Sequence, residues 1–461
     1  MQEKWEIYLN DEPLDDRKSG EFYLEIAKSV EQIEVQITLA SNQWCQVTLH
    51  DKSGARGQVL KTHLQEKVVG FIGQSVATTS ATMIAGSIPS GVWRVTYEIE
   101  GEVKVQSALH LTILQHATNQ WIEEGTENIM VHPKSNHKTG WVKGDLHTHT
   151  IFSDGKMSRE NNLCSAAKQE LDFFVATDHQ VVTHLWPKSD IAVYAGVELT
   201  TPMGHGNFLG VNHLLVEAYE ISSLPIHTQM MDLIKKNRGN GLFSVNHPFL
   251  EPWEWQLDEL PLAWIDALEL CNDPTFHDNT AATEKALHFW SKLWNDGWKI
   301  PGVGGSDSHL LMTEKYPGSE LPSLIGDPAT YIHVRALNQE DLLKGIKEGK
   351  TLLSRTGKIF LSSLEDREIL PGQQMKRLTG TLEVAIEGDQ FVTFEWVLDG
   401  QIVQTKSGTV STFTYQFNQE DYHWLRVDIR GDQGIFLGTM TPIYWHNQPS
   451  KFSIWKDVYD G

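Results

Sequence analysis

Hydrophobic and polar residues alternate along the first part of the chain, as they do in strands that bury one face. The alternation runs through residues 33–39, 45–49, 91–97 and 109–113. Turn-forming residues such as those at 51–54 separate these segments. Evenly spaced short strands are typical of β-sandwiches. We therefore predict an N-terminal β-sandwich-like domain over residues 1–125, with an accessory or dimer-forming role.

The pattern changes after a polar segment, residues 126–140, which we interpret as a linker because it holds Pro133, Asn136 and Gly140 and no apolar period. Beyond it, short apolar runs alternate with amphipathic segments of helical period, at residues 158–171, 226–238, 280–296 and 337–348. This alternation predicts βα units over residues 141–356. Strand patterns then return with an Asp399-Gly400 hairpin signal. They predict a C-terminal β-domain over residues 357–461.

The composition limits the choice of partners. A chain of 461 residues is too long for a single ordinary core. Its net charge of -22 opposes binding to nucleic acid or to an anionic membrane surface. We see no signal peptide and no apolar run of the ~18 residues that a membrane span needs. Three cysteines without pair spacing favour a reducing compartment, so we expect a cytoplasmic protein.

One short segment carries the strongest chemical signal. His147 and His149 are two residues apart, so in a strand both imidazoles point to the same face. Asp154 follows in a Ser-Asp-Gly turn and can bring a carboxylate to the same place. Imidazole and carboxylate together are ligands for Zn, Mn or Fe. Two neighbouring histidines alone are more often surface residues, so this pattern needs support from elsewhere.

That support comes from four later segments in which a short apolar run ends in a histidine or an acid. The residues at these ends are His179, Glu198, His247, Asp307 and His309. Buried parallel strands read as continuous apolar runs, and their carboxyl ends meet on one side of a sheet or barrel. The sequence therefore predicts a metal site built from the ends of several strands.

In this order the motifs GDLHTHTIFSDG, ATDH, GVE, NHP and GGSDSH resemble the PHP (polymerase and histidinol phosphatase) superfamily of metallohydrolases. The segments Gly204–Gly210, Leu268-Glu269 and Gly304–His309 are similar to the CehA/McbA type. The resemblance covers residues 141–356. It implies an α/β fold class, with a distorted (β/α)7 TIM-like barrel flanked by N- and C-terminal β-sandwich-like domains.

The resemblance also implies ligand sets for two or three divalent metal ions, Zn, Mn or Fe. The first ion would be held by His147, His149, Glu198 and Asp307. The second would be held by Asp154, His179 and His309. A third would use Glu198, His247 and a position near Asn207, where His205 is the alternative.

Such a site hydrolyses esters with a hydroxide that two cations share. We expect a metal-dependent hydrolase, first a phosphoesterase acting on small molecules. A carboxylic or carbamic ester hydrolase with the same site is the alternative. A rival of another class is an inactive ligand-binding or scaffold protein. The acidic charge argues for a small-molecule substrate over DNA, and homo-oligomerisation is left open.

Other residues near these motifs are candidates for contacts to substrate, for orienting a ligand or for donating a proton. They are Asp178, His184, Glu269 and His277. Turn bonding or simple exposure in a loop is the competing interpretation for Asp178 and His184. Three basic residues lie near the site segments, namely Lys143, Arg159 and Arg355. One of these could clamp a phosphate, although each alone also fits a solvated surface charge.

Overall fold

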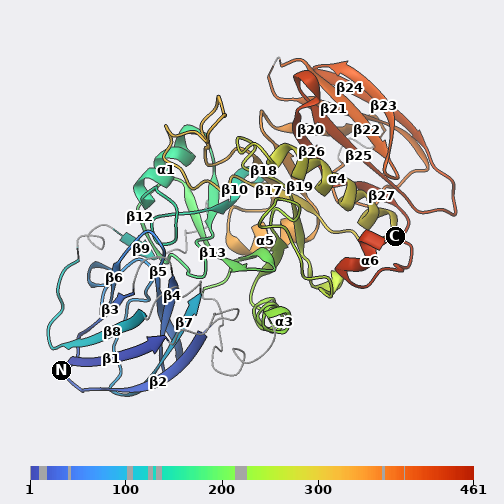
Figure 1. Ribbon diagram of the computed structural model, residues 1–461. Coiled ribbons are helices and arrows are strands. Elements are labelled where there is room, and N and C mark those ends of the chain that lie inside the picture. Colours follow the sequence, from blue (N-terminus) through green and yellow to red (C-terminus); the bar gives the residue numbers. More distant parts are fainter. Residues whose placement is uncertain are drawn as a thin grey trace.

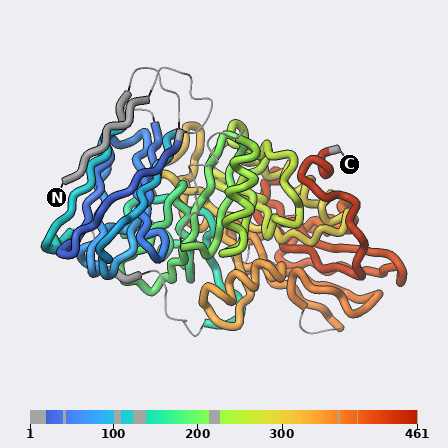
Figure 2. The backbone as a smooth tube through the Cα atoms, turned by 90° about the horizontal axis from the view of Figure 1, so that it is seen from below, coloured from blue at the N-terminus to red at the C-terminus, as the bar shows by residue number. Residues whose placement is uncertain are grey.

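The computed structural model describes residues 2–9, 18–39, 43–100, 107–122, 128–130, 138–212, 226–365, 369–388 and 390–460. It is a mixed α/β structure, rich in strands and with few helices. The N-terminal strands lie at one end, the segment with the motifs lies in the middle, and the last strands lie at the other end (Figure 1). The tube in Figure 2 shows the same order from a perpendicular direction.

Two four-stranded antiparallel sheets form the N-terminal part. One has the order β1 (Gln2–Leu9), β8 (Ser107–His116), β3 (Gln32–Thr38) and β6 (Lys67–Gly73). The other has the order β2 (Lys18–Ile26), β7 (Gly91–Glu100), β4 (Trp44–Asp51) and β5 (Gly54–Lys61). Ile33, Val35 and Ile37 of β3 are fully buried, as their alternation with polar residues predicts. They belong to a hydrophobic core that contains N-terminal residues alone.

The central part is a curved run of seven strands within a 14-stranded sheet. Its order is β17 (Gly302–Gly305), β16 (Ala267–Asn272), β15 (Leu242–Val245), β14 (Gly204–Leu209), β13 (Ala192–Thr201), β11 (Phe173–Ala176) and β10 (Gly140–Thr148). Its helices are α1 (Arg159–Lys168), α3 (Ile226–Asn237) and α4 (Asn279–Asn295). These helices begin and end within three residues of the sequence predictions.

The two ends of this run meet, so that the strand ends surround one point. The backbone N–H of Asp307 donates to the carbonyl of His147 at 2.8 Å. Thr148 and Ser308 form a parallel bridge beside it. Gly305 permits this approach, because a Cβ added there would lie 2.4 Å from the Cβ of His147. The run of glycines therefore brings the end of β17 against the end of β10.

The described residues do not show a TIM-like (β/α)7 barrel, and the distorted form that the resemblance implies stays a proposal. A barrel of that kind places a helix after each parallel strand, but β13 and β14 form an antiparallel hairpin. Only Pro202 and Met203 connect these strands, and Gly204 completes the turn with a φ of +111°. A parallel crossover needs a dozen or more residues. The short connection therefore forces the hairpin, and the described residues place no helix between β13 and β14.

The same sheet continues into the C-terminal part. Its further strands are β18 (Ala329–Val334), β19 (Thr351–Ser354), β26 (Phe436–Met440), β25 (His423–Arg430), β22 (Val392–Leu398) and β23 (Gln401–Gly408), with β27 (Ile443–Trp445) beside β25. A three-stranded sheet consists of β20 (Ile359–Ser363), β21 (Thr379–Ile386) and β24 (Val410–Gln416). The helices are α5 (Gln339–Lys347) and α6 (Trp455–Asp460), and the 3-10 turns are η1 (Val76–Thr78), η3 (Leu262–Trp264) and η4 (Asp432–Gly434).

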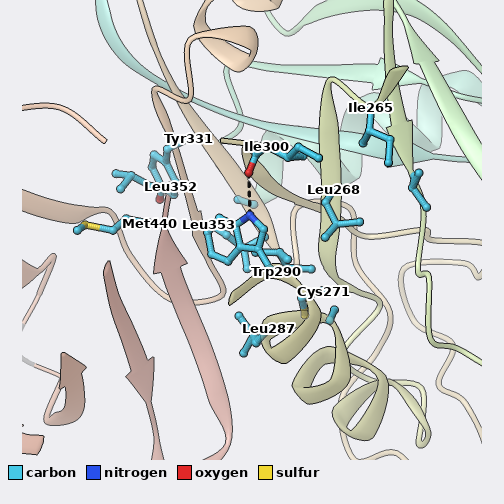
Figure 3. Close-up of a cluster of buried hydrophobic side chains, with 14 of the residues drawn as sticks. Ile265, Leu268, Cys271, Leu287, Trp290, Ile300, Tyr331, Leu352, Leu353 and Met440 are labelled. Carbon is cyan, nitrogen blue, oxygen red and sulfur yellow. Dashed lines mark hydrogen bonds between the residues drawn. The ribbon is translucent and has the colours of Figure 1, made fainter. Parts of the chain in front are cut away.

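Central and C-terminal residues share one hydrophobic core. Trp290 of α4 lies at its centre, and its indole N–H donates to the carbonyl of Ile300 at 2.7 Å (Figure 3). Leu268 of β16 and Met440 of β26 belong to the same buried cluster (Figure 3). The C-terminal strands therefore continue the central sheet and share its hydrophobic core. The domain boundary at residue 356 stays a prediction.

Two local predictions fall in this part and in the linker. The Asp399-Gly400 hairpin joins β22 to β23, with φ values of +49° and +82° that a tight turn of this type requires. Within the predicted linker, β9 (Asn128–Met130) pairs with β12 (Leu185–Pro187). Pro133 and Asn136 lie outside the described residues. Among the helices that the structure describes, none combines the length and apolar character needed to cross a bilayer.

Candidate metal centre

Strand β10 delivers the two histidines to the ring of strand ends. His147 and His149 are fully buried, and their ring centroids lie 5.2 Å apart. Thr148 points the other way and donates its hydroxyl to the carbonyl of Val175 at 3.1 Å. The alternation of side chains along a strand therefore places both imidazoles on the inner face, as the sequence predicts.

Asp178 holds the loop that carries Asp154. Its buried carboxylate accepts hydrogen bonds from the backbone N–H of Thr150 and from the hydroxyls of Ser153 and Thr183, each at 2.7 Å. The described contacts of Asp178 are thus to the loop and include no imidazole. Turn bonding, the competing interpretation, accounts for this residue, and its effect is to fix the turn before Asp154.

Four side chains meet in a first group. Its members are His147, His149, Glu198 and Asp307. The Nε2 atom of His147 lies 3.2 Å from one oxygen each of Glu198 and Asp307. The Nε2 atom of His149 lies 3.0 Å from Asp307 and 3.4 Å from Glu198. Four ligand atoms at this separation can coordinate one cation.

A second group shares His149 with the first. Its other members are Asp154, His179 and His309. The Oδ1 atom of Asp154 lies 3.1 Å from Nε2 of His309 and 3.4 Å from Nε2 of His179. The ring of His149 stacks on that of His309, with centroids 4.1 Å apart. The two groups therefore adjoin, as a site for two neighbouring cations requires.

A third, smaller group consists of His179, Glu198 and His205. The Nδ1 atoms of His179 and His205 lie 2.8 Å and 3.3 Å from oxygens of Glu198. Asn207 instead donates its amide to the carbonyl of Leu146 at 3.2 Å. Of the two alternatives left open by the sequence, the structure brings the imidazole of His205 to the shared glutamate.

His247 stands slightly apart from these groups. Its Nε2 atom lies 3.6 Å from Glu198 and 3.9 Å from Asp307. Its ring faces that of His205 at a centroid distance of 5.0 Å. A cation between the two rings could be coordinated by both. The first two groups, however, have ligand atoms that lie closer together and are more numerous.

Several inward-facing atoms of the cluster are buried and lack a hydrogen-bond partner among the described residues. They are Nε2 of His147, Nε2 of His149, Oδ1 of Asp154 and Oε2 of Glu198. Buried polar atoms without partners are rare and cost free energy of folding. Divalent cations between these atoms would satisfy all four. The residues present therefore fit the metal ions that the motifs imply.

Glu269 fixes the orientation of two histidines from outside the cluster. Its Oε1 atom accepts from Nδ1 of His147 at 3.1 Å, and its Oε2 atom accepts from the backbone N–H of His247 at 2.8 Å. The first contact leaves Nε2 of His147 free to face the ligand cluster. Carboxylates that orient ligating histidines in this way are a regular feature of metal sites.

Replacing Glu269 by alanine is expected to weaken metal binding by about 10–100-fold, because His147 loses the partner that fixes its ring and tautomer. Competition against a fluorescent chelator measures this affinity. Glu259→Ala, at an exposed position ten residues earlier, is the matched control and should bind metal as the parent protein does. Equal affinity in the parent and Glu269→Ala proteins would refute the orienting role.

Charge interactions inside the cluster oppose the effect of burial. Burial would raise the pKa of Glu198, but the imidazoles of His147 and His179 hold it well below its usual value. Burial would lower the pKa of His309, but the carboxylate of Asp154 raises it to about 10. His309 thus carries a proton when no cation is present, whereas burial and the neighbouring His309 lower the pKa of His149 to about 3. Cation binding must displace the proton of His309, so metal affinity should rise with pH.

The backbone is strained where it turns toward the cluster. Gln180, His247 and Asp307 have φ values of +60°, +25° and +48°. Non-glycine residues rarely adopt such angles, and strained residues gather at functional sites. The φ angle of Asp307 directs its carboxylate inward, where Asn272 donates to it at 3.1 Å.

Two residues that support the cluster were not predicted from the sequence. Asn246 donates its amide to Glu198 at 2.8 Å, and its place beside His247 was the available signal. Asp145 is buried and accepts from the backbone N–H groups of His147, Ser306 and Gly326. It ties the ends of β10 and β17 together, but its sequence position shows none of these distant partners.

The N-terminal sheets also reach the cluster. Trp44 of β4 packs edge-on against His179, with ring centroids 5.6 Å apart. Gln46 of the same strand donates its side-chain amide to the carbonyl of Gln180. Nothing in the pattern of β4 indicates this contact, because the two segments are far apart along the chain.

Other candidate residues lie away from the cluster. His184 is buried, and its backbone N–H donates to the carbonyl of Ala81 at 2.7 Å. The side chain of His277 is 68% exposed and pairs with Asp278 at 3.0 Å. Neither residue lines the cavity described below. The interpretation of His184 as an exposed loop histidine is therefore wrong, because the residue is buried, whereas His277 is the exposed one.

The basic residues near the motifs have other partners. Lys143 donates to the carbonyl of Gln169 at 2.7 Å, and Arg355 pairs with Asp327 at 3.0 Å. Arg159 donates to the carbonyl of Leu185 and covers the ring of Phe152 at 5.5 Å. None of the three lines the cavity.

A cavity of about 210 Å³ opens onto the cluster. One wall consists of ligand candidates, namely Asp154, His179, His205, His247, Asp307 and His309. The rest of the lining, which we call the distal wall, contains Leu250, Trp253, Asn272, Asp273, Phe276, Asn279 and Tyr316, and Asn272 adjoins the cluster through its hydrogen bond to Asp307. A small molecule in the cavity would therefore contact both the cluster and an aromatic, acidic surface.

Comparisons with known proteins establish no family for this chain. No protein-family model matches it, and no curated protein does. Among solved structures it is similar to a two-domain protein from Bacteroides vulgatus that contains a predicted PHP-like metal-dependent phosphoesterase, with 15% identity and a TM-score of 0.37, over 69% of this chain and 99% of the other. It is also similar to TmCBM61 in complex with β-1,4-galactotriose, with 15% identity and a TM-score of 0.16, over 23% of this chain and 68% of the other. Both likenesses are too distant to assign an activity, so the functional argument rests on the cluster.

Proposed function

We propose that this protein is a metal-dependent hydrolase of small-molecule esters, with two or three divalent cations of Zn, Mn or Fe held at the clustered side chains. The observation that carries the proposal is the convergence of buried nitrogen and oxygen atoms from His147, His149, Asp154 and Glu198, which lie at ion-pair distance from neighbouring ligand candidates but form no hydrogen bonds with the described residues. When bound, such cations activate water and neutralise charge that develops on the attacked ester. The motifs that resemble the PHP superfamily, CehA/McbA type, and the barrel that this resemblance implies belong to the same proposal.

Different residues of the chain would have different roles at the site. Glu198 contacts histidines of all three groups, so its two oxygens would keep neighbouring cations together. Glu269 and Asp178 hold the ligands in place through His147 and the Asp154 loop. Burial of these side chains excludes bulk water, and this strengthens every charge interaction in the site.

Phosphoesters are the first substrate class, and one observation favours a particular kind. Of the described residues that line the cavity, none is a lysine or an arginine. A phosphomonoester carries two negative charges and usually meets an arginine or lysine clamp. A cavity lined without lysine or arginine favours esters with at most one negative charge, namely phosphodiesters. Carboxylic and carbamic esters are the second candidate on the same ground.

A panel of p-nitrophenyl substrates tests this proposal. We expect the protein with Mn or Zn to hydrolyse bis(p-nitrophenyl) phosphate or a p-nitrophenyl carboxylic or carbamic ester faster than p-nitrophenyl phosphate. The chelated protein and the His149→Ala variant serve as controls that should show no activity. Failure to hydrolyse any member with either metal would support the rival proposal, an inactive ligand-binding or scaffold protein.

The remaining expectations follow from the same proposal. We propose a small-molecule substrate, because the net charge of -22 argues against a nucleic-acid polymer. The proposal includes no nucleic acid and no membrane as a partner, and it places the enzyme in the cytoplasm. Homo-oligomerisation through the N-terminal sheets stays open.

A further inference from the structure

Resting on the proposed function, we propose that the substrate carries an ammonium group at its non-reacting end, bound by the distal wall through aromatic rings and the carboxylate of Asp273. The ester would then be an aminoalkyl or trimethylammonioalkyl ester, with its reacting group at the metal cluster.

Three aromatic rings form a continuous surface on the distal wall. Phe276 lies between the others, with its centroid 6.3 Å from Trp253 and 5.2 Å from Tyr316, both in edge-to-face geometry. Trp253 is 43% exposed and lines the cavity. Rings set at angles to one another can surround a cation, which each attracts through its negative face.

Asp273 supplies a buried negative charge beside these rings. It is 3% exposed, and its carboxylate accepts from the hydroxyl of Ser323 at 2.7 Å and from Thr275. Within the described part of the chain, no lysine or arginine pairs with it; the nearby Arg355 pairs with Asp327. Burial, together with the negative charge of Asp307, raises the pKa of Asp273 to about 6. The group is thus ionised at neutral pH, and a cation would compensate its charge.

The other polar groups of the distal wall are also suited to a donor or a cation. The hydroxyl of Tyr316 is hydrogen-bonded to Asp273. The Oδ1 atom of Asn279 is buried and accepts no hydrogen bond from the described residues. The amide of Asn279 is already used, because it donates to the carbonyl of Asp273 at 2.8 Å. The wall therefore offers acceptors and aromatic rings to a ligand.

A neutral or anionic end group fits this wall less well. An anionic end group would meet the carboxylate of Asp273 with no lysine or arginine in the described lining to offset the repulsion. A purely apolar group would use the rings but would separate the buried carboxylate from water without compensation. An ammonium group satisfies the rings and the acid together.

Two matched phosphodiesters test the inference. The p-nitrophenyl ester of phosphorylcholine carries a trimethylammonium group, and p-nitrophenyl 3,3-dimethylbutyl phosphate replaces that group by an uncharged one of the same shape. Both release p-nitrophenolate, so only the charge of the retained end differs. We expect kcat/KM for the choline ester to exceed that for its neutral counterpart by about tenfold, a typical value for a partly desolvated cation–π site. Equal values, with hydrolysis of bis(p-nitrophenyl) phosphate intact, would overturn the inference and leave the proposed function standing.

A variant assigns the preference to the distal wall. Asp273→Asn keeps the shape of the side chain and removes its charge, so the ratio of the two kcat/KM values should fall to about twofold or less. Asp278→Asn, at an exposed acid five residues along the chain, is the matched control and should retain the full ratio. A ratio that is unchanged in Asp273→Asn would contradict the role of this carboxylate.

Binding is measured separately, so that failure of the proposed function can be recognised. Calorimetry on the metal-loaded protein compares choline with 3,3-dimethylbutanol, and neither compound contains an ester. Tighter binding of choline, lost in Asp273→Asn, supports the ammonium site even if none of the esters is hydrolysed. Equal or undetectable binding of both compounds overturns it.

Discussion

Replacing Glu198 by glutamine is expected to lower kcat/KM for the best ester substrate by more than about 100-fold. This loss exceeds the 10–100-fold that is typical when a residue outside the ligand set is changed. Glu198 is fully buried, and its oxygens lie 3.2 Å from His147 and 2.8 Å from His179. A glutamine offers a single neutral oxygen to two groups of histidines, so it cannot hold two cations in the same way.

Metal analysis should show the physical basis of this loss. We expect Glu198→Gln to retain at least one equivalent of metal fewer than the parent protein after dialysis. Glu314→Gln, which removes a surface carboxylate that pairs with Lys156, is the control and should keep both metal and activity. Parent-like turnover in Glu198→Gln would exclude it as the shared ligand.

The His149→Ala variant is expected to lose turnover to a similar or greater degree, because His149 belongs to both of the larger ligand groups. Asp307→Ala should behave in the same way, since Asp307 lies 3.0 Å from His149 and 3.2 Å from His147. The measurement is kcat/KM with Mn or Zn, together with thermal unfolding followed by circular dichroism.

Neither substitution should unfold the flanking strands. The N-terminal core contains residues such as Ile33 and Val95 and none of the cluster. His277→Ala, which removes an exposed histidine, is the control for loss of an imidazole. Activity that survives in both His149→Ala and Asp307→Ala would count decisively against the site.

Local patterns predicted much of this structure because their causes are local. The alternation of Ile33, Val35 and Ile37 with polar neighbours specifies a strand with one buried face wherever it lies. The spacing of His147 and His149 places both rings on one side of β10 for the same reason. The recurrence of acids and histidines after apolar runs then located the cluster, since strand ends meet on one side of the sheet.

What the sequence could not show depends on contacts between distant segments. The carboxylate of Glu269 meets the ring of His147 across 122 positions of the chain. The antiparallel pairing of β13 and β14 was also not predicted, although the connection of Pro202 and Met203 is too short for a parallel crossover. His277 sits one residue from Phe276 of the cavity wall, yet its side chain points to Asp278 and solvent. The direction in which a loop side chain points is set by packing, and residue types alone do not reveal this packing.

The most direct test of the account is the metal content of the purified full-length protein, measured by inductively coupled plasma mass spectrometry after loading with Mn or Zn and dialysis. Two or more equivalents per chain are predicted, with a clear loss in His149→Ala, which interrupts both ligand groups. Fewer than one equivalent in the parent protein, or equal content in the parent and the variant, would contradict the claim that these buried side chains form a metal centre.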